Sequence, residues 1–161
     1  MNGTQPLDQA TPIPALRTAA PAAGTPLRVG DYMTARVKTV AAGTPVLDAY
    51  YLMIQQGIRR LPVVRDEQLV GIVTLGDLRE ARPSPATSLS TYELNYLLAK
   101  LTVEQVMTHQ PFVVTPETSI KEAAGLMLAH KIGGLPVVDA THRLVGILTE
   151  SDLFRVLLTQ L

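Results

Sequence analysis

Two pairs of threonine and aspartate are the residues best suited to binding a ligand. Thr74 and Asp77 close the segment LVGIVTLGD, and Thr149 and Asp152 close LVGILTESD, which is identical at six of nine positions. Each segment reads as an apolar strand that delivers a hydroxyl and a carboxylate to the start of a helix. A carboxylate accepts hydrogen bonds from both hydroxyls of a vicinal diol. Free amides at a helix start can face a phosphate.

The same Thr-x-x-Asp spacing is also close to a helix capping box, in which the two side chains bond to each other's backbone amides. Taken alone, the spacing favours capping. The reciprocal box usually has the longer Glu or Gln at its last position, whereas this chain has Asp both times. We therefore expect the threonines to cap their helices while Asp77 and Asp152 remain free for a ligand.

Composition restricts the partners that the 161-residue chain can have. Hydrophobic residues make up 47% and charged residues 17%, which indicates a globular protein. The fold class that we predict, α+β, comes from the repeat and the family resemblance described below. Fourteen Lys and Arg balance fourteen Asp and Glu, so no general positive field attracts nucleic acid or a membrane. The chain has no cysteine and no membrane-length apolar run, and we expect a cytoplasmic protein.

Catalytic and metal-binding motifs are absent from the sequence. His109, His130 and His142 lack ligand-like spacing, and no phosphate-binding glycine loop or serine nucleophile motif occurs. We predict no catalytic residues, no metal and no cofactor.

An internal repeat organises most of the chain. Met33-Thr34 recurs as Met107-Thr108 and LPVV at 61–64 recurs at 135–138, both at an offset of 74 that becomes 75 after a polar turn. A repeat that keeps its register except in a turn indicates a structural duplication. Each copy reads as strand, helix, strand, strand, helix.

The first helix of each copy has apolar residues at one buried face, i, i+3, i+4, i+7 and i+8. The two helices are predicted to begin at Thr44-Pro45 and Thr118-Ser119 and to end at Gly57 and Gly133-Gly134. Their predicted buried positions are Val46, Ala49, Tyr50, Met53 and Ile54 in the first copy, and Ile120, Ala123, Ala124, Met127 and Leu128 in the second.

The predicted domain boundaries follow from this repeat. Residues 1–28 form a disordered leader rich in Pro, Ala and Thr, 29–82 the first repeat, 83–102 a hinge and linker helix, and 103–161 the second repeat. Ser90 and Glu93 resemble a capping box for the linker helix. Two leucine-rich stripes are interpreted as core, with an oligomer surface as the alternative: Leu94, Leu97, Leu98 and Leu101, and Phe154, Leu157, Leu158 and Leu161.

The repeated Met-Thr, LPVV and G-h-h-T-x-x-D motifs, in this order and twice, resemble a tandem pair of CBS domains, or Bateman module. The resemblance covers Gly30 to Leu161. It implies two β-α-β-β-α repeats packed with pseudo-two-fold symmetry around two clefts. Many members bind AMP, ADP, ATP or S-adenosylmethionine there.

The resemblance also implies the residues of each cleft. The ribose-binding carboxylates correspond to Asp77 and Asp152, and the phosphate-facing positions to Arg59-Arg60 in one copy and Gly133-Gly134 in the other. We expect a stronger site from Val37, Lys38, Ile58, Arg59, Arg60, Thr149, Ser151 and Asp152. We expect a weaker site from Thr74, Asp77, Phe112, Ile132, Gly133 and Gly134.

Two functions remain open at this point. The first is a regulatory module that senses an adenosine nucleotide and acts, as a homodimer, on a separate effector protein. The second is a ligand-free dimerisation module that uses the two leucine-rich stripes.

Overall fold

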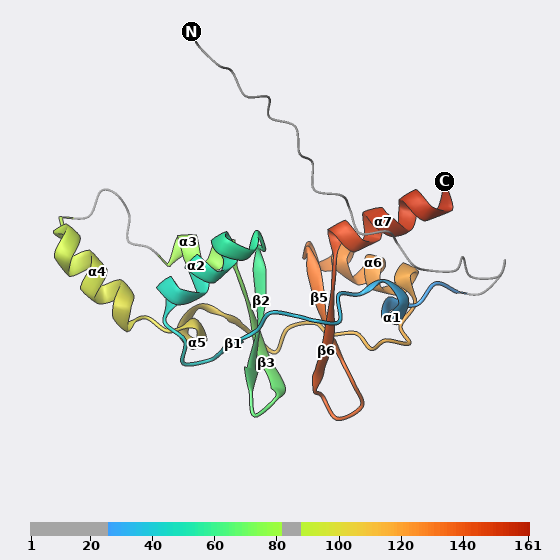
Figure 1. Cartoon of the computed structure of the whole chain (residues 1–161), viewed down its shortest axis with the longest axis horizontal. Helices are drawn as coiled ribbons and strands as arrows, with labels where there is room; N and C mark the ends of the chain where they lie inside the picture. Colours follow the sequence, from blue (N-terminus) through green and yellow to red (C-terminus); the bar gives the residue numbers. More distant parts are fainter. Residues whose placement is uncertain (1–25, 82–87) are drawn as a thin grey trace, which may run out of the picture.

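The computed structural model describes residues 26–81 and 88–161. Two β-sheets lie side by side, with their hairpin turns at one end of the molecule and most helices at the other (Figure 1). The predicted leader up to residue 25 and the hinge residues Pro83, Ser84 and Pro85 fall outside the described residues. Residues 26–28, predicted as part of the leader, are ordered, because Leu27 packs on a core and Arg28 donates to the Glu117 carbonyl at 2.9 Å.

The first repeat has the predicted β-α-β-β-α order, and the second has the same order except for its first strand; the mixed α+β fold class is confirmed. The first repeat consists of β1 (Val40–Ala41), α2 (Val46–Gln56), β2 (Arg60–Arg65), β3 (Gln68–Thr74) and α3 (Leu75–Glu80). The second consists of a single bridge from Val114 in place of its first strand, then α6 (Ile120–His130), β5 (Gly134–Val138), β6 (Leu144–Thr149) and α7 (Glu150–Gln160). The remaining elements are α1 (Val29–Tyr32), α4 (Thr91–Lys100), α5 (Val103–Val106) and β4 (Thr108–His109).

The two central hairpins share one geometry. In each, the antiparallel register shifts at the same place, between Val63 and Val64 in β2 and between Val137 and Val138 in β5. This shared irregularity supports the duplication that the sequence repeat indicates.

The opening segment of each repeat packs on the other repeat. Val29 of α1 is fully buried in the second-repeat core, and Thr34 bridges to Ile147 of β6. Val103 of α5 is fully buried in the first-repeat core, while β4 pairs with β3. The exchange ties the repeats together, because neither core is complete without a segment from the other repeat.

The first helices confirm three of the five buried positions in each copy. Val46, Ala49 and Met53 are buried in α2, as are Ile120, Ala123 and Met127 in α6. The last predicted positions are wrong, because Ile54 is 51% exposed and Leu128 is 81% exposed.

The helix ends are predicted correctly in the first copy only. Gly57 ends α2 in the left-handed conformation, as expected. In the second copy Lys131 adopts that conformation, with φ of 54°, so α6 ends before Gly133 and Gly134 begins β5. At the helix starts, Ser119 accepts a hydrogen bond from the Glu122 amide, whereas Pro45 caps α2 without a side-chain bond.

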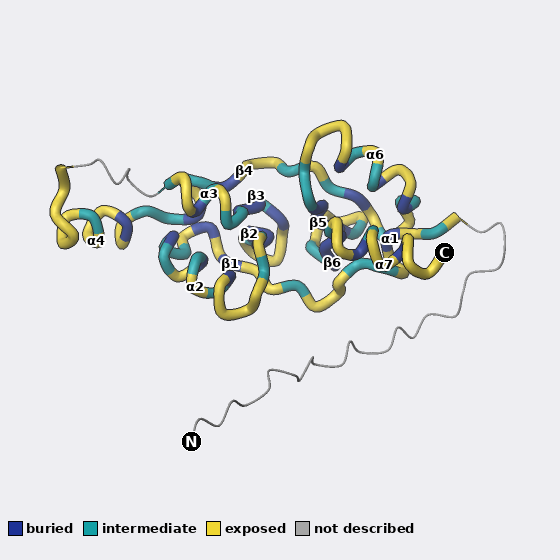
Figure 2. The backbone as a smooth tube through the Cα atoms, turned by 90° about the horizontal axis from the view of Figure 1, so that it is seen from above, coloured by how far each residue is buried: buried dark blue, intermediate teal, exposed yellow. Residues whose placement is uncertain are grey.

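The predicted core role of the leucine-rich stripes is wrong for most of their residues. Only Leu98 of the first stripe is buried, because α4 extends away from the sheets (Figure 2). Helix α7 buries Val156 and Asp152 instead, and it leaves its predicted stripe exposed: Phe154, Leu157, Leu158 and Leu161. No helix in the described parts of the chain is long and apolar enough to cross a membrane.

Candidate functional site

A cavity of about 540 Å³ is lined by residues of both repeats and by several charged side chains. All eight residues predicted for the stronger site line it: Val37, Lys38, Ile58, Arg59, Arg60, Thr149, Ser151 and Asp152. That they bind a ligand stays a prediction.

Three segments position these side chains. The left-handed turn at Gly57 ends α2 and turns Ile58 and Arg59 toward the cavity. The segment after Thr34 is fixed by its bridge to Ile147, and it carries residues 36–38 past the same opening. The end of β6 and the start of α7 form the opposite wall, so both repeats contribute to one site.

Asp152 is held by its own helix rather than left free for a ligand, which corrects the sequence expectation. Its Oδ2 accepts hydrogen bonds from the backbone amide and the hydroxyl of Thr149, at 2.8 and 2.9 Å. Its Oδ1 pairs with Arg155 Nη1 at 2.6 Å. With only 2% of its surface exposed, Asp152 is a buried carboxylate whose charge is compensated within the helix.

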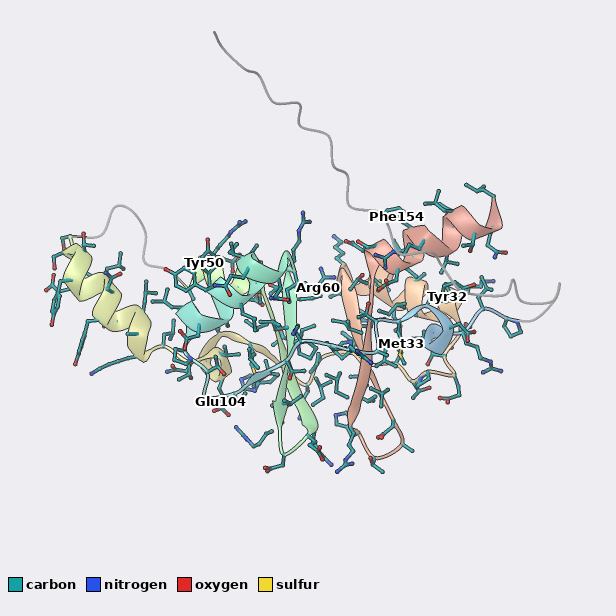
Figure 3. All side chains as sticks on the ribbon, viewed as in Figure 1. Tyr32, Met33, Tyr50, Arg60, Glu104 and Phe154 are labelled. Atoms are coloured by element: carbon teal, nitrogen blue, oxygen red, sulfur yellow. The ribbon has the colours of Figure 1, made fainter. Side chains whose placement is uncertain are left out.

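Arg60 spans the gap between the sheets (Figure 3). Its Nη1 donates a hydrogen bond to the Gly133 carbonyl of the second repeat. Burial lowers the pKa of the Arg60 guanidinium, the nearby Glu150 carboxylate opposes this shift, and the charge of Arg59 adds to it. An arginine remains protonated in proteins, so Arg60 keeps its charge in the cavity.

The cavity is strongly cationic although the chain is neutral overall. Its lining includes five cationic side chains but only two anionic ones, Glu150 and Asp152. The cations are Arg36, Lys38, Arg59, Arg60 and Arg155. Arginines present several N–H donors in a geometry that suits phosphate oxygens.

Sequence reasoning missed six residues that line the cavity. Two of them, Arg36 and Arg155, could have been found from their spacing to predicted site residues. Arg36 lies two residues before Lys38, and alternate residues of an extended segment share a side. Arg155 lies one helical turn after Asp152, at the i+3 spacing of an ion pair. The other missed residues are Thr34, Gly57, Ile147 and Glu150.

The polar side chains of the predicted weaker site, Thr74 and Asp77, hydrogen-bond to each other. Asp77 Oδ2 accepts from the Thr74 amide and hydroxyl at 2.7 and 2.8 Å, and Thr74 Oγ1 accepts from the Asp77 amide at 3.2 Å. The Phe112 ring stacks on His130, with centroids 3.8 Å apart. The expected free carboxylate is therefore a capping carboxylate here too.

A second cavity, of about 580 Å³, lies elsewhere. It is formed near the hairpin turns by Leu69, Val70, His109, Gln110, Pro111 and His142, none of which was predicted as a site residue. Within the described ranges, no group of three or more His, Asp or Glu side chains could hold a metal ion.

Comparison with known proteins decides the family. The CBS domain family matches residues 29–84 and 103–159, more than half of the chain and both sequence repeats. The chain belongs to the CBS domain family.

This CBS pair matches only part of the length of the curated relatives described here. The chloroplastic CBS domain-containing protein CBSX2 of Arabidopsis thaliana is 37% identical over 147 residues, which are 79% of this chain and 62% of that protein. The homoserine O-acetyltransferase of Methanococcoides burtonii is 35% identical over 130 residues, 80% of this chain. This CBS pair spans only 24% of that enzyme's length.

Two solved CBS pairs with this fold contain adenosine compounds. CBSX2 in complex with AMP superposes with a TM-score of 0.69 at 37% identity, covering 83% of this chain and 98% of that one. The CBS pair of MJ0100, in complex with 5'-methylthioadenosine and S-adenosyl-L-methionine, superposes with a TM-score of 0.71 at 27% identity. That match covers 85% of this chain and 100% of the other.

Proposed function

We propose that this CBS pair is a regulatory module that binds an adenosine nucleotide of the AMP, ADP or ATP class in the cationic cavity. The observation that carries the proposal is the clustering of five cations beside Thr149 and Asp152 in one cavity lined by both repeats. The AMP complex of CBSX2 supports the adenosine class. S-adenosylmethionine is the alternative ligand, and its positive sulfonium makes it a poorer match to a cationic cavity.

Each part of the ligand has a proposed position in the stronger site. Thr149, Ser151 and Asp152 hold the ribose, and Arg59 with Arg60 holds the phosphates. Val37, Lys38 and Ile58 line the base or the entrance. Arg155 pairs with Asp152 Oδ1, so a ribose hydroxyl that binds this oxygen shares it with Arg155 or displaces the guanidinium, which then becomes available to phosphate.

The weaker site is proposed to comprise Thr74, Asp77, Phe112, Ile132, Gly133 and Gly134, and to take an uncharged ligand or none. Glu80 stands where the stronger site has Arg155, one turn after the aspartate. No cationic side chain is among these six residues, so the site offers phosphate only backbone amides.

Binding would regulate by changing the geometry of the two repeats. A ligand that contacts both repeats favours the arrangement that it binds best, and it shifts the population accordingly. We propose a cytoplasmic homodimer that reports this change to a separate effector protein and has no catalytic activity of its own.

A thermal-shift series with AMP, ADP, ATP, S-adenosylmethionine and adenosine tests the proposal. A ligand at 100 times its dissociation constant adds about 2.7 kcal/mol of stability, which raises the Tm of a domain of this size by several degrees. We expect a shift with at least one adenine nucleotide. The absence of a shift with every compound contradicts nucleotide sensing.

A ligand-free dimerisation module is the second candidate, and the exposed face of α7 favours it. Phe154 is 66% exposed, Leu158 74% and Leu161 94%, so this apolar face of α7 is open to a partner. Sedimentation analysis of the wild type and of Leu158→Glu measures this role. A dimer that the substitution dissociates, together with no thermal shift, favours this candidate over the sensor.

A further inference from the structure

Arg60 contacts the residue that corresponds to it in the other repeat. The offset of 74 pairs Arg59 with Gly133 and Arg60 with Gly134, and the Arg60 side chain lies against both glycines. Two equivalent positions can touch only where they lie beside the pseudo-two-fold axis. At such a position two arginines would bring two guanidiniums together, with steric and electrostatic conflict.

Glycine at 133 and 134 provides the room that the Arg60 side chain occupies. A Cβ at Gly133 would lie 2.6 Å from Arg60 Nη2 and 3.1 Å from Glu150 Oε2. A Cβ at Gly134 would lie 2.7 Å from Arg60 Nη1. Backbone conformation does not require glycine here, because among the described glycines only Gly57 has a positive φ.

The Gly133 carbonyl also anchors Arg60. This oxygen accepts both the Arg60 side-chain bond and the amide of Glu150, at 3.2 Å for the latter. A guanidinium has five N–H donors, so an arginine anchored through Nη1 retains donors for another acceptor. Arg60 lines the cavity, where those donors can face a phosphate.

We propose that Gly133 and Gly134 are positioning residues of the cationic cavity, which hold Arg60 in the orientation that binds the ligand's phosphates. This inference rests on the proposed nucleotide function. It gives the glycine pair a second role. Gly133 and Gly134 provide no side chains to the weaker site, but they make room for Arg60 in the stronger site. After the duplication, one copy thus has an arginine at this position and the other has glycine, and the glycines leave room for the arginine side chain. Only one of the two sites therefore gains a cation.

Gly133→Ala tests the proposal, because every close neighbour of the new methyl group is the end of a flexible side chain. The fold should tolerate it while Arg60 is displaced. Since ordering a mobile side chain costs about 0.5–1.5 kcal/mol, we expect ATP affinity to fall about two- to thirteenfold in titration calorimetry. Adenosine affinity should change by less than about twofold, because adenosine lacks phosphate.

Gly125→Ala is the matched control, since a Cβ at Gly125 meets nothing within 4 Å. A double-mutant cycle with Arg60→Ala completes the test, because Gly133→Ala should cause no further loss once Arg60 is absent. Equal losses for ATP and adenosine, or the full loss in the Arg60→Ala background, overturn the positioning role. A wild type that binds neither compound overturns the nucleotide function itself.

Discussion

Asp77 and Asp152 have the same local role but different surroundings. Each closes a capping interaction with the threonine three residues before it, at nearly equal distances. Only Asp152 is almost fully buried, and only Asp152 pairs with an arginine one turn later. A buried carboxylate between cations is costly to leave unpaired, so a ligand hydroxyl that replaces Arg155 must restore a hydrogen bond.

Alanine substitution at the two aspartates separates capping from ligand binding. Both variants lose the same cap, which is worth about 1 kcal/mol, so Asp77→Ala controls for that part of the stability effect. Asp152→Ala additionally loses the ion pair with Arg155. We expect Asp152→Ala or Arg60→Ala to weaken nucleotide binding about tenfold or more, since hydrogen bonds to charged groups are worth about 1.5–3 kcal/mol. Asp77→Ala should change it far less. Titration calorimetry measures both, and equal losses contradict the asymmetry between the sites.

At the scale of elements, patterns that depend on neighbours in sequence were predicted well. The repeat, the two hairpins, the start of α4 at Ser90 and three of the five predicted buried positions in each of α2 and α6 follow from local spacing. The end of α6 was not predictable, because Lys131 takes a left-handed conformation that usually favours glycine. The apolar stripe of α7 was interpreted as core but is exposed, because the spacing of apolar residues does not show whether another element covers them.

The capping box of α4 gives a pH dependence with a definite sign. The Ser90 hydroxyl and amide donate to Glu93, and these bonds lower the Glu93 pKa below its ordinary value of 4.5. A carboxyl whose folded pKa is lowered stabilises the helix above its unfolded pKa. This stabilisation is lost as the pH falls through the folded pKa.

We therefore expect the first turn of α4 to lose helical Cα chemical shifts as the pH falls below about 4.5. In Glu93→Gln the amide oxygen can still accept from the Ser90 backbone, but the side chain no longer titrates. Its Cα shifts should be constant across the same range. A Glu93→Gln variant that frays with the wild-type pH profile contradicts the role of this carboxyl.

At the scale of the whole molecule, the exchange of opening segments was not visible in the sequence. A repeat shows that Val29 and Val103 are near the starts of equivalent units, but not which core each enters. The exchange joins the two repeats at both outer strands, through Thr34 on β6 and β4 on β3. The segment 33–38 that crosses between repeats also lines the cationic cavity, so the same connection that completes a core positions part of the candidate site.

This exchange predicts that core substitutions act on the repeat to which they do not belong in sequence. Val29 and Val103 are both fully buried, and truncating either to alanine should lower the free energy of unfolding by about 1–3 kcal/mol. Val29→Ala should reduce amide hydrogen-exchange protection mainly in α6 and β5, because Val29 packs in the second-repeat core. Val103→Ala should reduce it mainly in α2 and β2.

The two valines serve as controls for each other, since the substitution and the burial are the same and only the receiving core differs. If each variant instead weakened the repeat that contains it in sequence, the exchanged packing would be wrong. Val29 precedes residues 34 and 36–38, which line the cavity, but Val29 does not line it itself. Val29→Ala should therefore affect nucleotide affinity only by destabilising the second repeat. Saturating nucleotide should then restore part of the lost protection in α6, because a ligand that binds only the folded arrangement stabilises it in proportion to its occupancy.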